Sequence, residues 1–354
     1  MNSKIFFITG GCGFIGSNFI RYLINKINAK MVINLDRLTY AGNKSNLSEF
    51  ESYDHYKFIE DDIINSNTVR KIFHNYQPDC LIHFAAESHV DRSIDGPKDF
   101  INTNILGTYT LLQESLNYYS ALEESSKEIF CFHHISTDEV FGSLGELGSF
   151  TETTPYDPSS PYSASKASSD HLVRAWNRTF GLPVLITNCS NNYGPYQFPE
   201  KLIPLIIINC LYEKQLPVYG KGQNIRDWLY VEDHCEAIYT VLSNGKIGDT
   251  YNIGGKCEIK NIEIVNTICE ILDKIKPRTE NRSYKELITF VKDRPGHDYR
   301  YSINATKIEN ELNWMPNESF KTGIKKTIQW YLDNQNWWEE ILNKKYKQER
   351  LGLL

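Results

Sequence analysis

The 354-residue chain lacks the features that would direct it to nucleic acid or to a membrane. It has no excess of basic residues, because 38 lysines and arginines stand against 44 aspartates and glutamates and leave a net charge of −6. Nucleic acids and anionic membranes attract basic surfaces, so this balance argues against both as partners. No apolar run approaches the ~18–20 residues that a membrane-spanning helix requires.

The chain also lacks paired cysteines. Its eight cysteines are scattered, with no C-x-x-C pair, and most lie in apolar runs, where a free cysteine behaves as a small hydrophobic residue. Residues 5–8 are apolar but lead straight into a glycine loop, and they are too few for the apolar part of a signal peptide. We therefore expect a cytoplasmic protein that holds no metal.

What the chain does have is an alternation of short apolar segments and helical patterns. The patterns predict strands at 5–9, 31–35, 58–60, 80–85, 129–136 and 184–190, and helices at 18–27, 68–76, 100–119 and 161–180. Such alternation is typical of an α/β protein with a parallel sheet covered on both faces, joined by right-handed crossovers. The sequence therefore predicts a doubly wound, Rossmann-type fold.

The character of the sequence changes after residue 190, where loops lengthen and prolines become frequent. We expect residues 1–190 to form the dinucleotide-binding domain, with segments near 227–253 returning to its sheet. Residues 191–354 are expected to form mainly a smaller substrate-binding lobe. The lobe ends in helices, since residues 320–342 have helical spacing and contain three tryptophans.

A glycine-rich loop joins the first predicted strand to the first predicted helix. Gly10, Gly13 and Gly16 have the spacing G-x-x-G-x-x-G, which leaves bare backbone where a pyrophosphate approaches a helix N-terminus. Glycines alone could form only a tight structural turn. Here Asp36 ends the next strand 20 residues after Gly16, where a carboxylate binds both ribose hydroxyls of NAD and repels the 2′-phosphate of NADP.

The pair Tyr162 and Lys166 has the spacing that places two side chains on one helix face, a turn apart. Three other pairs share this spacing: Tyr22/Lys26, Tyr40/Lys44 and Tyr53/Lys57. Only Tyr162 begins a helix after a Pro-Ser-Ser-Pro turn and follows a strand that ends in Ser-Thr. The functional interpretation is that Lys166 and the Thr137 hydroxyl stabilise a phenolate at Tyr162. The alternative is a surface tyrosine with a helical salt partner.

Asp138 and Glu139 directly follow Thr137. An arbitrary Asp-Glu pair is a solvated loop, but this pair falls at the carboxyl end of a strand, where doubly wound sheets bind their ligands. Two adjacent carboxyl groups in one cleft can be driven to different pKa values and act as acid and base. We therefore predict a second reacting pair beside Tyr162.

These motifs occur in an order that resembles the extended short-chain dehydrogenase/reductases and, within them, the dTDP-glucose 4,6-dehydratases. The shared segments cover nearly the whole chain: TGGCGFIGS, LDRLTYAGN, DDI, HFAAESHVDRSI, STDEVFG, PSSPYSASKA, NCSNNYGPYQFPEKLIP, RDWLYVEDH, YNIGG, DRPGHDYRY and ERLG. Two positions depart from the family pattern. Cys12 replaces an alanine in the glycine loop, and Phe141 stands where a tyrosine is common.

The resemblance implies an NAD-dependent hydro-lyase of deoxysugar biosynthesis. The reaction converts dTDP-glucose to dTDP-4-keto-6-deoxyglucose by oxidation at carbon 4, elimination of water across carbons 5 and 6, and return of hydride to carbon 6. Tyr162, with Thr137 and Lys166, removes the proton of the carbon 4 hydroxyl. Glu139 then removes the carbon 5 proton, and Asp138 protonates the departing carbon 6 hydroxyl.

The resemblance also implies two sets of binding residues. The NAD set comprises Gly10, Gly13, Phe14, Ile15, Gly16, Asp36, Arg37, Leu38, Thr39, Asp62, Ile63, Phe84, Ala85, Ala86, Glu87, Ser88, Thr103, Tyr162, Lys166 and Asn192. The nucleotide-sugar set comprises Ser88, Thr137, Asn191, Lys201, Leu202, Pro217, Val218, Tyr219, Arg226, Asn261, Asp293, Arg294, Pro295, Gly296 and His297. The forked guanidinium groups of Arg226 and Arg294 suit a diphosphate, although either could be a structural ion-pair partner. The family also implies a homodimer formed through the helices that carry Phe100 and Tyr162.

Two other classes of function compete with this interpretation. A nucleotide-sugar 4-epimerase or decarboxylase would share the fold, but relatives of those kinds lack the Asp-Glu pair or keep the Glu without the Asp, which makes Asp138 the discriminating residue. A catalytically idle dinucleotide sensor or scaffold would not need Thr137, Tyr162 and Lys166 intact. The sequence does not distinguish a thymine from a uracil base in the nucleotide sugar, because the two bases differ by one methyl group that is recognised by packing alone.

Overall fold

The computed structural model describes residues 4–293 and 296–344. Its centre is a seven-stranded sheet with the order β10-β6-β5-β4-β1-β2-β3, in which every neighbouring pair is parallel. The strands are β1 (Ile5–Thr9), β2 (Met31–Asp36), β3 (Tyr56–Glu60), β4 (Cys80–His83), β5 (Cys131–Thr137), β6 (Val184–Cys189) and β10 (Thr250–Ile253). The doubly wound α/β prediction is confirmed, and β1 has the predicted bounds at both ends.

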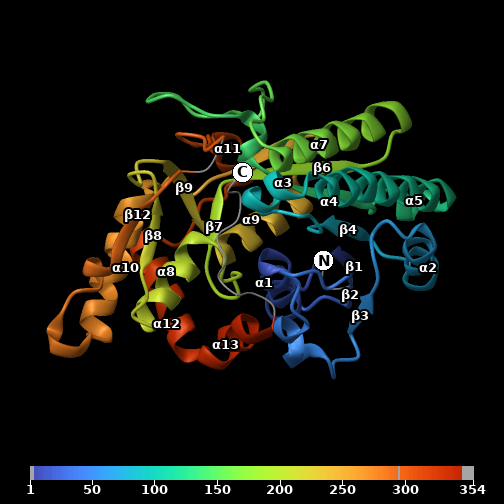
Figure 1. Cartoon of the computed structure of the whole chain (residues 1–354). Coiled ribbons are helices and arrows are strands. Elements are labelled where there is room, and N and C mark those ends of the chain that lie inside the picture. The colour runs from blue at the N-terminus through green and yellow to red at the C-terminus, as the bar shows by residue number, and fades with distance from the viewer. Residues whose placement is uncertain (1–3, 294–295, 345–354) are drawn as a thin grey trace.

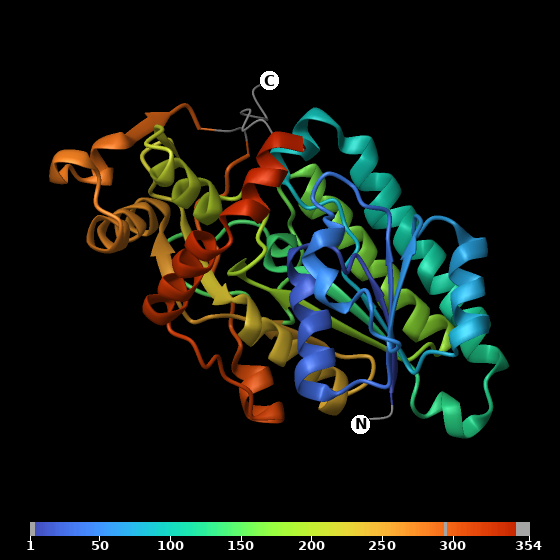
Figure 2. The same cartoon turned by 90° about the horizontal axis from the view of Figure 1, so that it is seen from below.

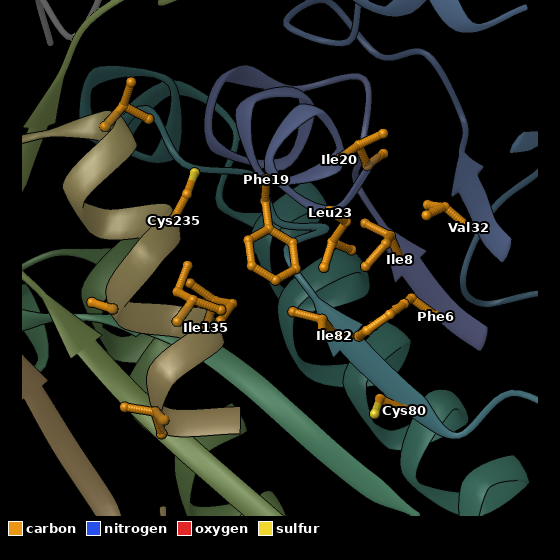
Figure 3. Packing of buried hydrophobic residues seen from close by; sticks show 14 of the residues in the cluster. Phe6, Ile8, Phe19, Ile20, Leu23, Val32, Cys80, Ile82, Ile135 and Cys235 are labelled. Carbon is orange, nitrogen blue, oxygen red and sulfur yellow. The ribbon is translucent and has the colours of Figure 1, made fainter. Parts of the chain in front are cut away.

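Helices cover both faces of this sheet (Figures 1 and 2). One face packs against α1 (Phe14–Tyr22), the π-helical turn Leu23–Ile27 and α9 (Val231–Asn244). The other packs against α2 (Ser66–Tyr76), α5 (Thr108–Ala121) and α7 (Pro161–Phe180). Because side chains alternate along a strand, Phe6 and Ile8 join the first layer and Phe7 the second. Figure 3 shows Phe19 and Leu23 of the first layer beside Ile8.

The remaining elements of the sheet side are shorter. They are α3 (Val90–Asp95), α4 (Pro97–Phe100), the π-helical segment Ile101–Gly107, α6 (Glu124–Lys127), α11 (Thr306–Leu312) and 3₁₀ helices at Lys44–Phe50 and Asp138–Phe141. The single helix predicted over 100–119 is therefore divided into α4, the π-helical segment and α5. Gly107, the last residue of that segment, has no room for a side chain, since a Cβ there would overlap the Ile63 side chain.

A second core lies outside the large sheet, among the elements that follow β6. These are β7 (Asn191–Tyr193), α8 (Leu202–Leu211), β8 (Leu216–Tyr219), β9 (Ile225–Tyr230), β11 (Glu258–Lys260), α10 (Asn261–Ile275), β12 (Ile288–Val291), 3₁₀ helices at Thr279–Asn281 and Tyr284–Leu287, α12 (Phe320–Asp333) and α13 (Gln335–Lys344). Two small sheets, β11-β9-β7 and β12-β8, pack there with α8, α10 and α12. The C-terminal helices that the sequence predicts over residues 320–342 are α12 and α13.

Between these elements the chain returns to the large sheet, as predicted, through α9 and the edge strand β10. All eight cysteines are free thiols, and seven of them are buried. Within residues 4–293 and 296–344, no helix combines the length and hydropathy that crossing a membrane would require.

Candidate active site

Two cavities meet at the carboxyl ends of the parallel strands, which is where ligands bind in doubly wound sheets. The first cavity, of about 300 Å³, lies over the ends of β1, β2, β4, β5 and β6. The second cavity, of about 780 Å³, lies between that edge and the elements α8, β8 and β9. Ser88, Glu139, Asn191 and Lys201 line both cavities, so a ligand in one would meet a ligand in the other.

The first cavity gathers the residues of the predicted NAD set. All of that set line its wall except Leu38. Leu38 instead adopts a left-handed backbone conformation, with φ of 54°, and its N–H donates to Asp36 Oδ1 at 2.8 Å. Residues that the sequence analysis missed also line this cavity, among them Gly42, Asp61, Gln197, Phe198 and Glu200.

The glycine loop forms a cradle that side chains would fill. Gly10 has φ of 72°, and a Cβ there would lie 2.6 Å from backbone atoms of Ala85. A Cβ on Gly16 would overlap the Gly10 carbonyl oxygen. α1 begins just after Gly13 without a side-chain cap, so its N-terminal N–H groups are available to an anion. This geometry fits the pyrophosphate of a dinucleotide.

Asp36 is held in place at the end of β2. Its Oδ2 accepts from the Cys12 N–H at 2.9 Å and its Oδ1 from the Leu38 N–H, so the carboxylate is fixed at the cavity wall. The side chain of Cys12 is fully buried in the hydrophobic core and is absent from the cavity wall. The departure from alanine at this position therefore leaves the pyrophosphate cradle open.

The predicted reacting residues of β5 and the following turn are Thr137, Asp138 and Glu139. Thr137 Oγ1 donates to Asp138 Oδ1 at 3.3 Å and accepts from the Glu139 N–H at 3.2 Å, which caps the short 3₁₀ helix Asp138–Phe141. One hydroxyl thus fixes the Asp138 carboxyl group and the backbone of Glu139 relative to the end of the strand. The ring of Phe141 is buried and stacks on Phe150. Position 141 therefore contributes to the packing of the core and provides no hydroxyl group to the site.

The environment of Asp138 favours the protonated form of its carboxyl group. Burial raises its pKa well above the usual value, and the nearby charges of Glu139 and Asp227 raise it further. Its Oδ2 has no hydrogen-bond partner within the described part of the chain. A carboxyl group that stays protonated at neutral pH can donate a proton to a leaving hydroxyl, whereas Glu139, which lines both cavities, faces the space for the sugar.

Tyr162 and Lys166 are placed by the first turn of α7. Ser160 caps the helix in a reciprocal pair with Ser163, and Pro161 occupies the first helical position. Tyr162 and Lys166 then lie one turn apart in the wall of the first cavity, and Lys166 Nζ donates to the Ile135 carbonyl at 2.8 Å. The helix 161–180 is confirmed with its predicted bounds.

The electrostatic environment of Tyr162 opposes a phenolate in the protein alone. Burial raises the pKa of Tyr162 well above its usual value, Glu139 raises it further, and the Thr137 hydroxyl lowers it. Burial also lowers the pKa of Lys166 to about 8. Protein groups alone therefore do not produce a phenolate near neutral pH, and the positive nicotinamide ring of the predicted cofactor is the charge that would complete the environment.

The second cavity gathers the predicted nucleotide-sugar residues. Its wall includes ten of them: Ser88, Asn191, Lys201, Leu202, Pro217, Val218, Tyr219, Arg226, Asn261 and His297. Thr137 lines the first cavity, and Asp293 contacts His297 Nδ1 at 2.6 Å without lining either. Gly296 is exposed. Arg294 and Pro295, like the ERLG segment at 349–352, lie outside the described residues.

Arg226 is anchored before any ligand binds. Its guanidinium donates to the carbonyl oxygens of Ile225 at 2.8 Å, Asp298 at 3.0 Å and Tyr299 at 3.4 Å, and it stacks over the Tyr301 ring at 4.2 Å. Tyr301 also lines the cavity, with His89, Asp91, Asn209 and Trp228. The sequence analysis named none of them as site residues, although all but Asn209 lie within the shared segments.

Comparison with known proteins places the chain in a family. The model of the family described as GDP-mannose 4,6 dehydratase matches residues 7–327. A dTDP-glucose 4,6-dehydratase of Escherichia coli is 58% identical and is aligned over 98% of this chain and 99% of its own length. The crystal structure of a dTDP-glucose 4,6-dehydratase from Streptomyces venezuelae with NAD and TYD bound is 44% identical, with a TM-score of 0.87 over 95% of this chain and 99% of that chain. That of the Bacillus anthracis enzyme in complex with NAD is 43% identical, with a TM-score of 0.85 over 96% and 99%. This chain belongs to the GDP-mannose 4,6-dehydratase family, and within it to the dTDP-glucose 4,6-dehydratases.

Proposed function

We propose that the protein catalyses the NAD-dependent dehydration of dTDP-glucose to dTDP-4-keto-6-deoxyglucose. The observation that carries this proposal is the buried carboxyl group of Asp138, whose pKa is raised by burial and which shares one strand end with Glu139. Tyr162 and Lys166 stand in the adjoining wall. Relatives named dTDP-glucose 4,6-dehydratase, at 53–58% identity over nearly full length, support the same reaction.

The first half of the reaction would use Tyr162. The residues of the first cavity would hold NAD, which when bound accepts a hydride from carbon 4 and gives it back at carbon 6. Tyr162 takes the proton of the carbon 4 hydroxyl as the carbonyl forms. Lys166 and the Thr137 hydroxyl stabilise the phenolate that this requires.

The second half would use the carboxyl pair. The ketone at carbon 4 acidifies the proton on carbon 5, and Glu139 removes it. Asp138 donates its proton to the carbon 6 hydroxyl, which leaves as water, so the carbon 5–carbon 6 double bond forms with all atoms accounted for. Glu139 then returns a proton to carbon 5 when carbon 6 is reduced. A 4-epimerase has no leaving group to protonate and would gain nothing from Asp138.

Isotopic labelling tests this function directly. We expect deuterium at carbon 4 of dTDP-glucose to appear at carbon 6 of the product within the same molecule, and solvent deuterium to enter at carbon 5. An epimerase would return the label to carbon 4. Loss of the carbon 4 label to solvent would rule out the proposed hydride return, and mass spectrometry with NMR of the product distinguishes the three outcomes.

We further propose that residues 1–190 form the NAD-binding domain, that 191–354 form mainly the nucleotide-sugar lobe, and that the enzyme acts in the cytoplasm as a homodimer. Eight free cysteines support a reducing compartment.

Exposed apolar side chains at Ile101, Leu106 and Tyr109, 45–50% accessible, support pairing of two protomers through the helices beside α7. Sedimentation velocity of the wild type and of Leu106→Arg tests the dimer, since a charge in that interface should yield monomers.

NAD is expected to bind much more tightly than NADP. The fixed carboxylate of Asp36 favours ribose hydroxyls and repels a 2′-phosphate. Calorimetric titration of the apo protein should show this preference. Asp36→Asn should reduce the ratio of the affinity for NAD to the affinity for NADP. Glu49→Gln, which changes an exposed carboxylate paired with Arg21, is the matched control and should leave the ratio of the two affinities unchanged. Equal affinities in the wild type would contradict the assignment.

Arg226→Ala is expected to weaken nucleotide-sugar binding about ten- to a hundredfold, the effect of losing a hydrogen bond worth ~1.5–3 kcal/mol to a charged group. Arg226→Lys keeps the positive charge but loses the forked guanidinium, so its affinity for the nucleotide sugar should lie between those of the wild type and Arg226→Ala. Because Arg226 also holds three carbonyl groups, thermal unfolding must be recorded beside calorimetry. Normal binding with a lowered unfolding midpoint would make Arg226 a structural residue.

A further inference from the structure

The helix that carries Tyr162 and Lys166 continues their four-residue spacing into the protein interior. Asp170 and Arg174 follow at the same interval, so Tyr162, Lys166, Asp170 and Arg174 share one face of α7. That face packs on β5. Asp170 is fully buried, and a buried carboxylate is costly unless its partners are well arranged. No sequence motif singled it out.

The surroundings of Asp170 are built for an anion. Its Oδ2 accepts from Ser136 Oγ at 2.9 Å, Tyr156 OH at 2.7 Å and Asn188 Nδ2 at 3.3 Å. Its Oδ1 faces His134 Nε2 at 3.2 Å. Burial alone would raise the pKa of Asp170, but the contact with His134, the charge of Lys166 and the hydrogen bond from Ser136 lower it to about 2. The carboxylate is therefore charged at every pH at which the enzyme would work.

His134 stands between this anion and Lys166. Its Nε2 lies 3.4 Å from Lys166 Nζ and 3.3 Å from Ser169 Oγ, besides its contact with Asp170. Burial lowers the pKa of His134 to about 4, so the ring is neutral near pH 7. The Asp170 carboxylate and Ser169 Oγ can accept from a protonated Nε2, whereas Lys166 Nζ can only donate to an unprotonated one. Lys166 Nζ also donates to the Ile135 carbonyl and lines the first cavity.

We propose that Asp170, acting through the neutral imidazole of His134, is the buried counter-ion that keeps Lys166 protonated and in position beside Tyr162. Asp170 is thus a positioning residue of the oxidation step, an inference that rests on the proposed function only in assigning Tyr162 to that step. The ionisable groups around Lys166 and His134 come from every element packed there: Tyr162, Asp170 and Arg174 of α7, His83 of β4, His134 of β5 and Cys189 of β6. Asp138 and Glu139 line the same cavity wall, and Asp170 is the carboxylate that raises the pKa of Lys166.

The pH profile of turnover tests this role, because the sign of the effect is fixed. Removing an anion beside an ammonium lowers its pKa, so in Asp170→Asn Lys166 would lose its proton at lower pH than in the wild type. The alkaline limb should move down by about 1–3 pH units, the range for loss of an opposite charge, and activity should recover on acidification. The introduced amide fits, since its oxygen can accept from Ser136, Tyr156 and Asn188 while its nitrogen faces His134.

Tyr156→Phe is the matched control, because it removes one hydrogen bond to Asp170 and leaves the charge. Its alkaline limb should stay at the wild-type pH. If both variants lose activity to the same degree at every pH, with the limb unmoved, Asp170 is structural and the proposal fails. The transfer of deuterium from carbon 4 to carbon 6 is measured on the wild-type protein in parallel. If the wild type transfers the label, the proposed function stands and only the role of Asp170 has failed.

A stability cycle gives a readout that does not depend on activity, and it covers the case in which Asp170→Asn is poorly folded. Removing one partner of a buried ion pair leaves an uncompensated charge, whereas removing both does not. Adding Lys166→Met to Asp170→Asn should therefore recover at least half of the fall in the unfolding midpoint that Asp170→Asn causes alone. Adding Lys166→Met to Tyr156→Phe should recover none of the fall that Tyr156→Phe causes. Additive losses in the Lys166→Met, Asp170→Asn double variant would overturn the coupling.

Discussion

Glu139→Gln is expected to oxidise the sugar but to release product about 10²–10⁴-fold more slowly than the wild type, the usual effect of losing a general base. The substitution leaves Tyr162 and Lys166 in the first cavity untouched, so oxidation at carbon 4 still proceeds. Without a base at position 139 the carbon 5 proton stays in place and elimination cannot follow. Stopped-flow absorbance should therefore show reduced cofactor appearing on the enzyme at mixing while the keto sugar lags.

Glu146→Gln is the matched control, because that glutamate follows the same strand but is exposed and lines neither cavity. It should turn over at the wild-type rate with no accumulation of reduced cofactor. A Glu139→Gln variant with wild-type turnover would remove Glu139 from the chemistry. A variant that forms no reduced cofactor at all would instead place Glu139 in the oxidation step.

The local patterns of the sequence sufficed for the large sheet and for most of its helices. Ile5–Thr9 and Pro161–Phe180 have the predicted bounds because clear signals flank them, a glycine loop after the strand and a Pro-x-x-Pro turn with a serine cap before the helix. The predicted strand 129–136 is β5, Cys131–Thr137, and that end is what brings Thr137 to the site. Boundaries depend on tertiary pairing and are less well specified than the elements themselves.

Other features depend on packing that a local pattern does not contain. The π-helical segment Ile101–Gly107 passes Gly107 directly over Ile63, a contact between residues far apart in sequence. Lobe residues such as Tyr301 and Trp228 reach the second cavity only because β9 and the bridge at Arg300 bring them there. His134 and Asp170 looked like an ordinary strand residue and an ordinary helix residue, and only the packing of α7 on β5 reveals them as neighbours of Lys166.

Tyr162→Phe is expected to stop the reaction one step earlier than Glu139→Gln. Without the hydroxyl nothing takes the proton of the carbon 4 hydroxyl, so the carbonyl does not form and no reduced cofactor appears at mixing. Turnover should fall about 10²–10⁴-fold. Tyr156→Phe again provides the control, since it removes another hydroxyl that contacts α7 but lines neither cavity, and its reduced-cofactor signal should match the wild type at neutral pH.

The double variant Tyr162→Phe, Glu139→Gln decides the order of the two steps. If oxidation at carbon 4 precedes removal of the carbon 5 proton, the reduced-cofactor signal of Glu139→Gln must vanish when Tyr162 is also replaced. The second substitution should add little further loss of turnover, because residues that act in sequence on one intermediate are not additive. Reduced cofactor that persists in the double variant would show that some group other than Tyr162 takes the hydroxyl proton. The Asp-Glu pair would then act on a ketone formed without its predicted base.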